Sequence, residues 1–380
     1  MTEQKMRVLH VITSLGDGGA EAVLYRLVTR DTADEHEVVS LVGEGKYGRM
    51  FRAAGVPVYS LDMRPGRVSW DGIRKLWQIC RASHADVIQT WMYHSDLLGG
   101  LVARLSGKPH VVWGIHNSTF TPGSSSRAFR AVVRTCGLLS LRVPSRIVVC
   151  AQNAALVHEE LGYSADRMVV IPNGYDLSLF TPDTEARRAL RAEWSVPDDV
   201  PLIGMVARFD PLKDHANLIA ALAFLMRKGL RFYAVCIGTG MTAENAEMAR
   251  RLEGAGVEHV VRLIGPRHDI PAVMNALDIH VLSSVGEAFP NVLCESMACG
   301  TPCVTTDVGD ARLIVGETGW VVPPRHPEML ADALAAALSQ WALPETWVLR
   351  QKAASKRINE HFGIDLMVER YRNVWTEVAD

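Results

Sequence analysis

The sequence feature that most constrains the fold is an alternation of short, β-branched apolar runs with longer helical stretches, which occurs twice along the chain. The apolar runs are nearly continuous, as expected of parallel strands that are buried on both faces. The first series comprises residues 7–13, 37–42, 57–61, 87–90, 110–114 and 146–150, and the second comprises residues 201–207, 231–237, 259–264, 279–283, 302–305 and 320–322. A polar break at residues 180–199 separates the two series.

Helical patterns fill the intervals between these predicted strands. They include residues 20–30, 70–83, 217–228 and 327–338. Two successive strand–helix series predict an α/β protein with two doubly wound, Rossmann-like parallel-sheet domains that face a cleft. Open sheets of this kind bind ligands beyond the carboxyl ends of their strands, so the chemistry is expected there.

A length of 380 residues exceeds one ordinary core and suits two domains of about 150–200 residues each. We expect the first domain at 1–175, the second at 176–360 and a C-terminal helix at 361–380. In that helix Val368, Tyr371 and Trp375 recur at helical spacing, which predicts an apolar face that packs back on the first domain.

Composition and cysteine usage exclude several classes of protein. A net charge of −2 provides no overall attraction to nucleic acid. Seven cysteines without a CxxC pair argue against a disulfide framework or a zinc knuckle and favour a reducing cytosol. The opening residues MTEQKMRVLHVI lack the pattern of a secretory signal. No window approaches the roughly 20 apolar residues of a spanning helix, so we expect a cytoplasmic protein.

Glycine-rich segments follow strands in both halves. Gly18 and Gly19 lie in GDGGAE, where glycines let backbone approach a ligand, although a tight strand-to-helix turn explains them equally well. Gly238 and Gly240 match G-x-G-x-x-A after a strand, as in dinucleotide sites. Such a site also needs an acidic residue at the end of the next strand, and 260–264 has none there. This absence disfavours a dinucleotide-dependent oxidoreductase.

Two cations stand in the loop after the predicted strand 201–207. Arg208 and Lys213 are five residues apart in a loop that contains Pro211. A planar guanidinium and a point-charge ammonium can converge on one diphosphate. Solvated loop cations are the alternative interpretation.

Two carboxylates flank the start of another predicted helix. Pro290 suits the first turn of a helix that runs through Met297 and stops near Gly300. The N–H groups at that start suit a phosphate. Glu287 precedes the helix and Glu295 lies inside it, so both can hold hydroxyls of a sugar or a ribose. A capping role for Glu287 and an exposed position for Glu295 are the alternative.

In this combination the chain resembles the retaining GT-B glycosyltransferases of family 4, the glycosyl transferases group 1 family. The family's E-x7-E element matches Glu287 to Glu295, and its basic pair matches Arg208 and Lys213. Its glycine loop matches residues 16–21, IPNGYD at 171–176 marks the usual entry to the second domain, and GPRHDIPAVMNALDIHVLSS at 265–284 is also typical. The resemblance spans nearly the whole chain and is most specific in the C-terminal half.

The resemblance implies a role for each candidate residue. Arg208 and Lys213 would neutralise the departing diphosphate. Glu287 would contact the donor sugar and Glu295 the ribose. A further set would lie on the donor side: Gly18, Gly19, Gly238, Gly240, Arg267, Phe289, Asn291 and Val292. Of these, Asn291 and Val292 would offer backbone N–H groups to phosphate or sugar. His116, at the end of a first-domain strand, resembles the family's active-site histidine, with a loose loop histidine as the alternative.

Two departures from the family pattern bear on the site. Asp214 stands where a glycine usually follows the lysine, and could weaken or orient Lys213. Ala288 replaces the glycine common after the first glutamate, which narrows the expected sugar pocket. The chain contains no D-x-D pair, the usual metal–diphosphate clamp of the other major glycosyltransferase fold. We therefore expect protein cations in place of a metal ion, and no cofactor.

The interval between Asp96 and Glu159 holds no acidic residue. Within 104–146 the residues Arg127, Arg130 and Arg134 recur at helical spacing, which suits an anionic membrane leaflet. A basic helix packed on the first domain is the alternative. With the membrane interpretation the protein contacts the inner face of the cell membrane peripherally, and its acceptor is lipid-linked or part of an envelope glycan.

The sequence therefore predicts a retaining, metal-independent glycosyltransferase of bacterial polysaccharide or lipid-linked envelope glycan assembly. A UDP-sugar is the expected donor because UDP is the commonest carrier in the resembled family. A glycan or lipid-linked molecule is the expected acceptor, and no nucleic-acid partner is expected. A GT-B-like nucleotide-sugar epimerase, a dinucleotide-dependent oxidoreductase and a catalytically silent binding protein remain the alternatives.

Overall fold

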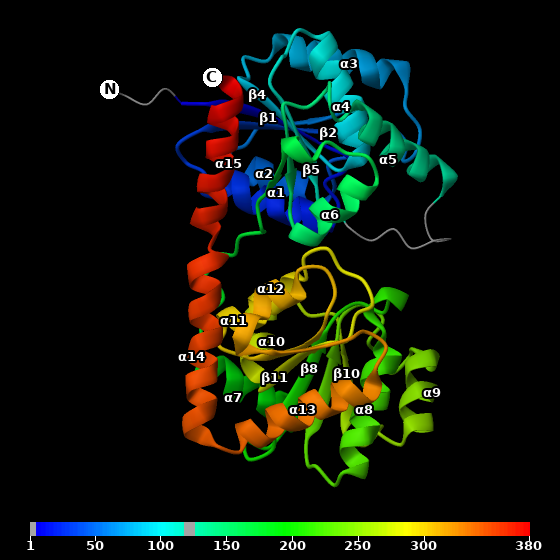
Figure 1. Ribbon diagram of the computed structural model, residues 1–380, viewed down its shortest axis with the longest axis vertical. Coiled ribbons are helices and arrows are strands. Elements are labelled where there is room, and N and C mark those ends of the chain that lie inside the picture. Colours follow the sequence, from blue (N-terminus) through cyan, green and yellow to red (C-terminus); the bar gives the residue numbers. More distant parts are fainter. Residues whose placement is uncertain (1–4, 118–125) are drawn as a thin grey trace. The chain divides into compact units, whose positions relative to one another are not determined.

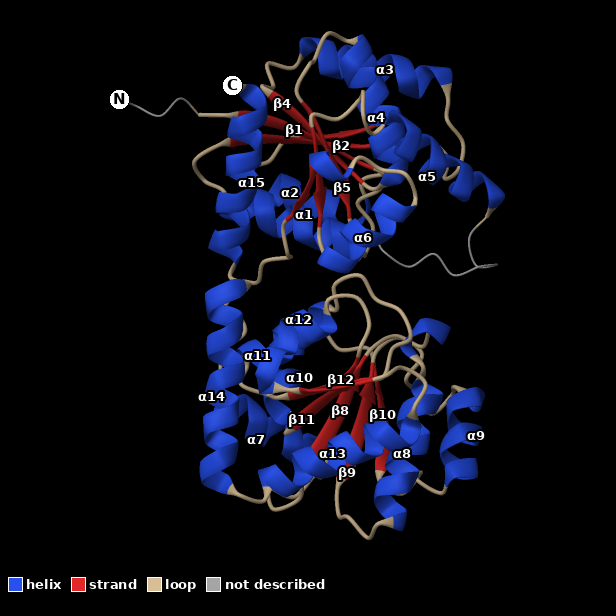
Figure 2. Cartoon of the chain, viewed as in Figure 1, coloured by secondary structure: helices blue, strands red, loops and turns tan. Residues whose placement is uncertain are grey.

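The computed structural model describes residues 5–117 and 126–380. By its internal contacts the chain forms two compact units. Unit 1 comprises Met1–Gly174 together with Ile364–Asp380, and unit 2 comprises Tyr175–Gly363. Both are built of a parallel β-sheet with helices packed against it (Figure 2).

Unit 1 is organised around a parallel sheet with the strand order β3-β2-β1-β4-β5-β6-β7. Its strands are β1 (Arg7–Ile12), β2 (Glu35–Ser40), β3 (Val58–Ser60), β4 (Val87–Trp91), β5 (Val111–Ile115), β6 (Arg146–Val149) and β7 (Met168–Val170). The chain runs outward from β1 to β3 and returns to β4 on the other side of β1. The strand order therefore reverses between β1 and β4, which is where a ligand is expected.

Helices cover this sheet, and the last of them comes from the far end of the sequence. They are α1 (Gly19–Arg30), α2 (Gly45–Ala53), α3 (Trp70–Ala82), α4 (Tyr93–Leu105), α5 (Arg127–Leu139), α6 (Gln152–Glu160) and α15 (Ile364–Ala379). Helix α15 packs on α1 and β4 (Figure 1). Trp375 on α15 is fully buried, and its Nε1 donates to Gln89 Oε1 at 3.0 Å. The apolar face of α15 is thus part of the unit 1 core.

Unit 2 repeats the plan with the strand order β10-β9-β8-β11-β12-β13. Its strands are β8 (Leu202–Val206), β9 (Tyr233–Ile237), β10 (Val261–Gly265), β11 (Ile279–Leu282), β12 (Cys303–Thr306) and β13 (Trp320–Val322). Its helices are α7 (Thr184–Glu193), α8 (His215–Arg227), α9 (Ala246–Ala255), α10 (Ile270–Ala276), α11 (Asn291–Ala298), α12 (Ala311–Val315), α13 (Pro327–Trp341) and α14 (Pro344–His361). The strand order here reverses between β8 and β11.

The predicted fold class, two parallel-sheet α/β domains, is confirmed, and every predicted strand is present. Two elements differ from the sequence prediction. Strand β7 was not predicted because it has three residues, all half-buried, which leaves little apolar signal. Helix α7 lies inside the predicted polar break, because it buries only Leu190 and Arg191 and otherwise presents polar residues.

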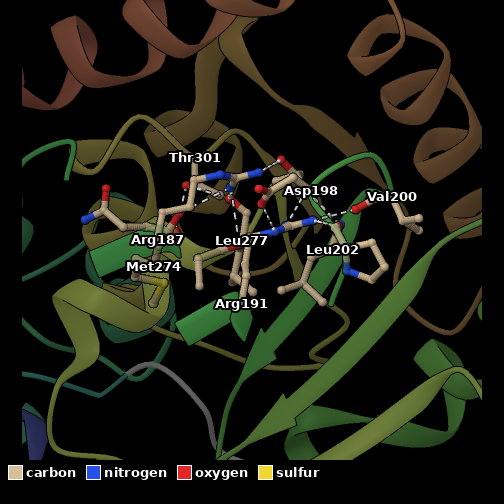
Figure 3. A network of polar contacts seen from close by, with 12 residues as sticks. Arg187, Arg191, Asp198, Val200, Leu202, Met274, Leu277 and Thr301 are labelled. Atoms are coloured by element: carbon tan, nitrogen blue, oxygen red, sulfur yellow. Dashed lines mark hydrogen bonds and ion pairs between the residues drawn. The ribbon is translucent and has the colours of Figure 1, made fainter. Parts of the chain in front are cut away.

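A buried ionic network attaches α7 to the sheet of unit 2 (Figure 3). Arg191 is 1% exposed, and its guanidinium donates to Asp278 at 3.0 Å. Arg187 donates to the other oxygen of Asp278 at 2.7 Å. That carboxylate also accepts the backbone N–H of Leu202, the first residue of β8, at 2.8 Å. Because removal of one partner would leave a buried charge unpaired, this network should be costly to break.

The cysteines and the lengths of the apolar helices can be compared with the sequence analysis. All seven cysteines are buried and unbridged, as expected from their odd number and spacing. Within the described residues, none of the helices has both the length and the apolar character needed to span a bilayer.

Candidate functional site

Unit 2 brings Lys213 and Glu287 together across the point where its strand order reverses. Lys213 follows β8, Glu287 follows β11, and Lys213 Nζ lies 2.5 Å from Glu287 Oε1. Both side chains are mostly buried, with 20% and 14% of their areas exposed. Ligands of open α/β sheets bind at such a reversal, beyond the carboxyl ends of the strands. The pair therefore marks the candidate site of unit 2.

Two serines at the end of β11 fix this ion pair. Ser284 Oγ donates to Glu287 Oε1 at 2.6 Å. Ser283 Oγ donates to the backbone carbonyls of Lys213 at 2.9 Å and Asp214 at 3.0 Å. The loop after β8 is thus held against the end of β11. Lys213 and Glu287 are therefore held in place by contacts within unit 2.

The structure explains why an aspartate can replace the expected glycine after Lys213. Asp214 has φ 46° and ψ 56°, in the left-handed region that favours glycine and tolerates aspartate. Its side chain accepts the N–H of Asn217 at 3.2 Å and so caps α8. The acid therefore serves the helix start, while the ammonium of Lys213 pairs with Glu287.

Arg208 and Lys213, which were expected to converge, contact different carboxylates. The guanidinium of Arg208 donates two hydrogen bonds of 3.1 Å to Asp210. The side chain of Arg208 is 68% exposed, and an exposed ion pair contributes only about 0–1 kcal/mol. Arg208 can therefore leave Asp210 for a more highly charged anion at little cost.

Gly238 and Gly240 allow the loop after β9 to pack on the loop that carries Arg208. Gly238 has φ 142°, and a Cβ there would lie 2.3 Å from the carbonyl oxygen of Ala207. Gly240 has φ 81°, and a Cβ there would lie 2.7 Å from Cβ of Phe209. Both positions therefore require glycine for backbone packing, whether or not a ligand is present.

Helix α11 begins beside Glu287 in the sequence and supplies three further predicted residues. Asn291 and Val292 are its first residues, and both are half-buried, as is Glu295 in its second turn. Pro290 is the N-cap and not a first-turn residue as predicted, and it offers no side-chain cap. Backbone N–H groups at this uncapped start, together with the helix dipole, suit a phosphate.

The remaining predicted residues of unit 2 make contacts within the fold. Arg267 donates to Asp269 at 2.8 and 2.6 Å and to Glu193 at 2.7 Å, and these bonds raise its pKa above the usual range. Phe289 is 7% exposed, and its ring lies 5.7 Å from that of Phe362. These contacts give Arg267 and Phe289 structural roles in the protein as described.

In unit 1, His116 directly follows β5 and stacks on Trp91, the last residue of β4. The ring centroids are 4.9 Å apart and the planes differ by 16°. Burial lowers the pKa of His116 to about 4, so its ring is neutral near pH 7. Its Nε2 is buried and has no hydrogen-bond partner among the described residues. A neutral imidazole with an unpaired nitrogen suits a hydrogen bond to a ligand hydroxyl.

A series of buried side chains holds Trp91 in turn. Trp91 Nε1 donates to His10 Nδ1 at 3.1 Å, and His10 Nε2 lies 3.0 Å from His36 Nδ1. His36 Nε2 lies 3.4 Å from Asp31 Oδ2. Because the indole N–H occupies Nδ1 of His10, a neutral His10 carries its proton on Nε2 and donates it to His36. Burial keeps His10 neutral by lowering its pKa well below the usual value.

Comparisons with known proteins identify the family of this chain. The family described as "Glycosyltransferase Family 4" matches residues 17–179, and the family described as "Glycosyl transferases group 1" matches residues 200–340. A D-inositol 3-phosphate glycosyltransferase of Corynebacterium glutamicum (strain R) is 35% identical over 360 residues, covering 87% of this chain and 82% of that protein. The chain belongs to the GT-B glycosyltransferases.

Two further proteins are similar to this glycosyltransferase over most of its length. HepE of Anabaena has been solved with UDP (TM-score 0.84) and with UDP-glucose (TM-score 0.83); each structure is 22% identical and covers 98% of this chain and 100% of that chain. A UDP-Gal:alpha-D-GlcNAc-diphosphoundecaprenol alpha-1,3-galactosyltransferase of Escherichia coli is 22% identical over 310 residues, covering 80% of this chain and 78% of that protein.

The glycine loop of this glycosyltransferase shapes the start of α1. Gly18 is the extended N-cap of α1, and Gly19 is its first residue. A Cβ on Gly18 would lie 2.3 Å from Oε2 of Glu21, whose other oxygen accepts the hydroxyl of Ser14 at 3.1 Å. The loop is thus closed around its own carboxylate, which accords with the tight-turn interpretation.

Two residues of the glycosyltransferase that matter to its site were not predicted. Ser284 binds Glu287, and Trp91 supports His116. Both lie at or just after the carboxyl end of a strand next to a strand-order reversal. Their position could have identified them, since the sequence analysis already expected ligands at the carboxyl ends of those strands.

Proposed function

We propose that this glycosyltransferase is a retaining family 4 enzyme that takes a sugar from a nucleotide diphosphate sugar, with a UDP-sugar favoured. The observation that carries the proposal is the pairing of Lys213 with Glu287 beside the uncapped start of α11. This arrangement places a cation, N–H donors and a carboxylate at one strand-order reversal. The complexes of HepE with UDP and UDP-glucose support the choice of donor.

The proposed mechanism assigns charge neutralisation to the cations of unit 2. When the glycosidic bond breaks through an oxocarbenium-like state, negative charge grows on the departing diphosphate. Lys213 then interacts with the diphosphate, and Arg208 leaves Asp210 to join it. The N–H groups of Asn291 and Val292 bind the same anion.

The carboxylates of unit 2 would bind hydroxyl groups. In the proposed mechanism Glu287 accepts hydrogen bonds from the donor sugar when Lys213 turns to the phosphates, and Ser284 keeps Glu287 in position. Glu295 holds the ribose hydroxyls. In unit 1 the neutral ring of His116 would contact the transferred sugar.

Metal independence and an acceptor class complete the proposal. The two cations replace a metal ion at the diphosphate, so transfer should persist in excess EDTA. Loss of transfer on chelation and its recovery with magnesium would contradict metal independence.

We propose a lipid-linked or envelope-glycan acceptor, supported by the diphosphoundecaprenol acceptor in the name of the Escherichia coli relative. We place the enzyme in the cytoplasm, with peripheral contact at the membrane.

The experiment that tests the proposed donor is a thermal-shift comparison of UDP, GDP and ADP. A ligand at 100 times its Kd stabilises the folded protein by about 2.7 kcal/mol. UDP should raise the Tm most. No shift with any of the three nucleotides would contradict the donor assignment. Proton NMR of the product then compares the anomeric configuration with that of the donor, and inversion would reject the retaining mechanism.

A further inference from the structure

Unit 1 contains a large apolar cavity that no part of the proposed donor chemistry uses. Its volume is about 840 Å³, within the range of roughly 300–1,000 Å³ typical of sites for small organic ligands. The side chains that form most of its apolar lining are Val68, Leu97, Leu98, Leu101, Phe129 and Val132. They come from the loop after β3 and from α4 and α5.

The position of the cavity connects it to the substrate end of unit 1. It is also lined by Thr13 and Ser14, which directly follow β1, and by His94 in the first turn of α4. Helix α4 follows β4, so the cavity spans the strand-order reversal between β1 and β4. Thr13 Oγ1 and Ser95 Oγ, 2.9 Å apart, join the two sides of that reversal. This is the end of the sheet at which ligands bind.

Two exposed arginines stand at this apolar lining. Arg64 and Arg67 line the cavity, whereas the three exposed arginines of α5, Arg127, Arg130 and Arg134, do not. Among the described residues none of the five takes part in an ion pair, and no lining residue is acidic. Val68 and Trp70 beside them are 64% and 86% exposed. An apolar hollow with unpaired arginines at its lining is complementary to a molecule with a hydrocarbon chain and an anionic head.

We propose that this cavity binds the hydrocarbon chain of a phosphate-bearing lipid acceptor, whose phosphate meets Arg64 and Arg67. The proposal deepens and rests on the proposed function, because only a transferase needs an acceptor at this end of the sheet. A concave, chain-sized cavity suits one lipid molecule, whereas a bilayer surface is matched by a flat or convex apolar face.

Calorimetric titration with decyl phosphate, below its micellar concentration, tests the proposal on the full chain. Decyl phosphate should bind, and inorganic phosphate and neutral decyl glucoside should each bind at least about tenfold more weakly. Ala128→Trp, which fills the lining, should weaken decyl phosphate binding at least about tenfold. Ala131 lies on the same helix but does not line the cavity, so Ala131→Trp should change the affinity for decyl phosphate less than about twofold.

A second variant separates the charge from the cavity. Arg64→Ser with Arg67→Ser should weaken decyl phosphate binding but leave decyl glucoside binding unchanged. UDP affinity, measured in the same samples, should stay at the wild-type value in every variant, so a failed donor assignment is recognised separately. Equal decyl phosphate affinity in Ala128→Trp and Ala131→Trp would overturn the proposal. Decyl phosphate binding to the wild-type protein no tighter than that of inorganic phosphate or of decyl glucoside would overturn it as well.

Discussion

At the scale of single residues, the contact between Trp91 and His116 links the interior of unit 1 to its candidate active-site imidazole. Trp91 is fully buried, stacks on His116 and is anchored through its Nε1 to His10. The stack with Trp91 fixes the plane of the His116 ring, whose buried Nε2 has no hydrogen-bond partner among the described residues. Trp91 is therefore a positioning residue for the proposed reaction.

Replacement of Trp91 by Phe should lower kcat by about tenfold, because a small misplacement of a reacting group is costly, while the KM for the donor stays unchanged. Steady-state kinetics with varied donor measures both quantities. Trp113→Phe is the matched control, since Trp113 is equally buried on the neighbouring strand. An equal fall in kcat for both variants would assign the effect to general loss of packing and contradict the positioning role.

The sequence predicted the identity of the charged residues better than their partners. Lys213 and Glu287 were each predicted, but their ion pair depends on β8 and β11 being neighbours, which follows from tertiary strand order. The cap formed by Asp214 could not be foreseen either, since it depends on a backbone φ of 46°. Arg267 was assigned to the donor, yet the structure pairs it with Asp269 and Glu193.

At the scale of elements, α4 is joined to β4 and β5 through one buried carboxyl. Asp96 on α4 is fully buried and accepts from Thr90 Oγ1 at 2.6 Å and from the N–H of Gly114 at 3.3 Å. Burial raises its pKa to about 7, although these hydrogen bonds partly oppose the shift. The folded protein therefore holds a proton on Asp96 over a pH range in which the unfolded chain has lost it.

The free energy of unfolding should consequently fall as the pH rises from about 4 to about 7 and then level off, because the folded state binds more protons in that window. Asp96→Asn should remove this part of the pH dependence, as measured by urea unfolding. Asp365→Asn, at an exposed residue paired with Arg30, should leave it intact. An unchanged slope in Asp96→Asn would show that Asp96 is ionised when folded.

Helix α15 contributes buried side chains to the core of unit 1. Trp375→Ala should lower the free energy of unfolding by about 3–5 kcal/mol, because it leaves a cavity and strands the buried oxygen of Gln89. Urea denaturation measures this loss. Trp70→Ala, at a side chain that is 86% exposed, should cost less than about 0.5 kcal/mol. Similar losses for both variants would contradict the packing of α15.

Element boundaries were predictable where the apolar signal was strong. Helix α15 was predicted within 361–380 and lies at Ile364–Ala379, because its buried side chains keep a regular helical spacing. Helix α7 was missed because charges, including the buried Arg191, occupy positions that an apolar pattern would fill. The apolar cavity of unit 1 was also missed, since five separate segments of the chain form it.

At the scale of the whole molecule, the arginines of α5 lead to a prediction about membranes. Arg127, Arg130 and Arg134 are exposed, and residues 118–125 of the predicted basic stretch lie outside the described part of the chain. Binding to vesicles should need anionic lipid and weaken with salt, since exposed charges are screened over about 10 Å at 0.1 M. Replacement of the three arginines by Ser should reduce sedimentation with phosphatidylglycerol vesicles and leave UDP affinity unchanged. Equal binding to neutral and anionic vesicles would reject this contact.

The central claim is that Lys213 and its surroundings in unit 2 form the diphosphate site of a UDP-sugar glycosyltransferase. Calorimetric titration of the protein with UDP tests it most directly. Wild-type protein and Lys228→Ala, which removes an exposed lysine paired with Asp332, should bind UDP equally. Lys213→Ala should bind it at least about tenfold more weakly, because a partly buried charge contact to the diphosphate is lost. UDP affinity that is absent in the wild type, or equal in Lys213→Ala and Lys228→Ala, would contradict the claim.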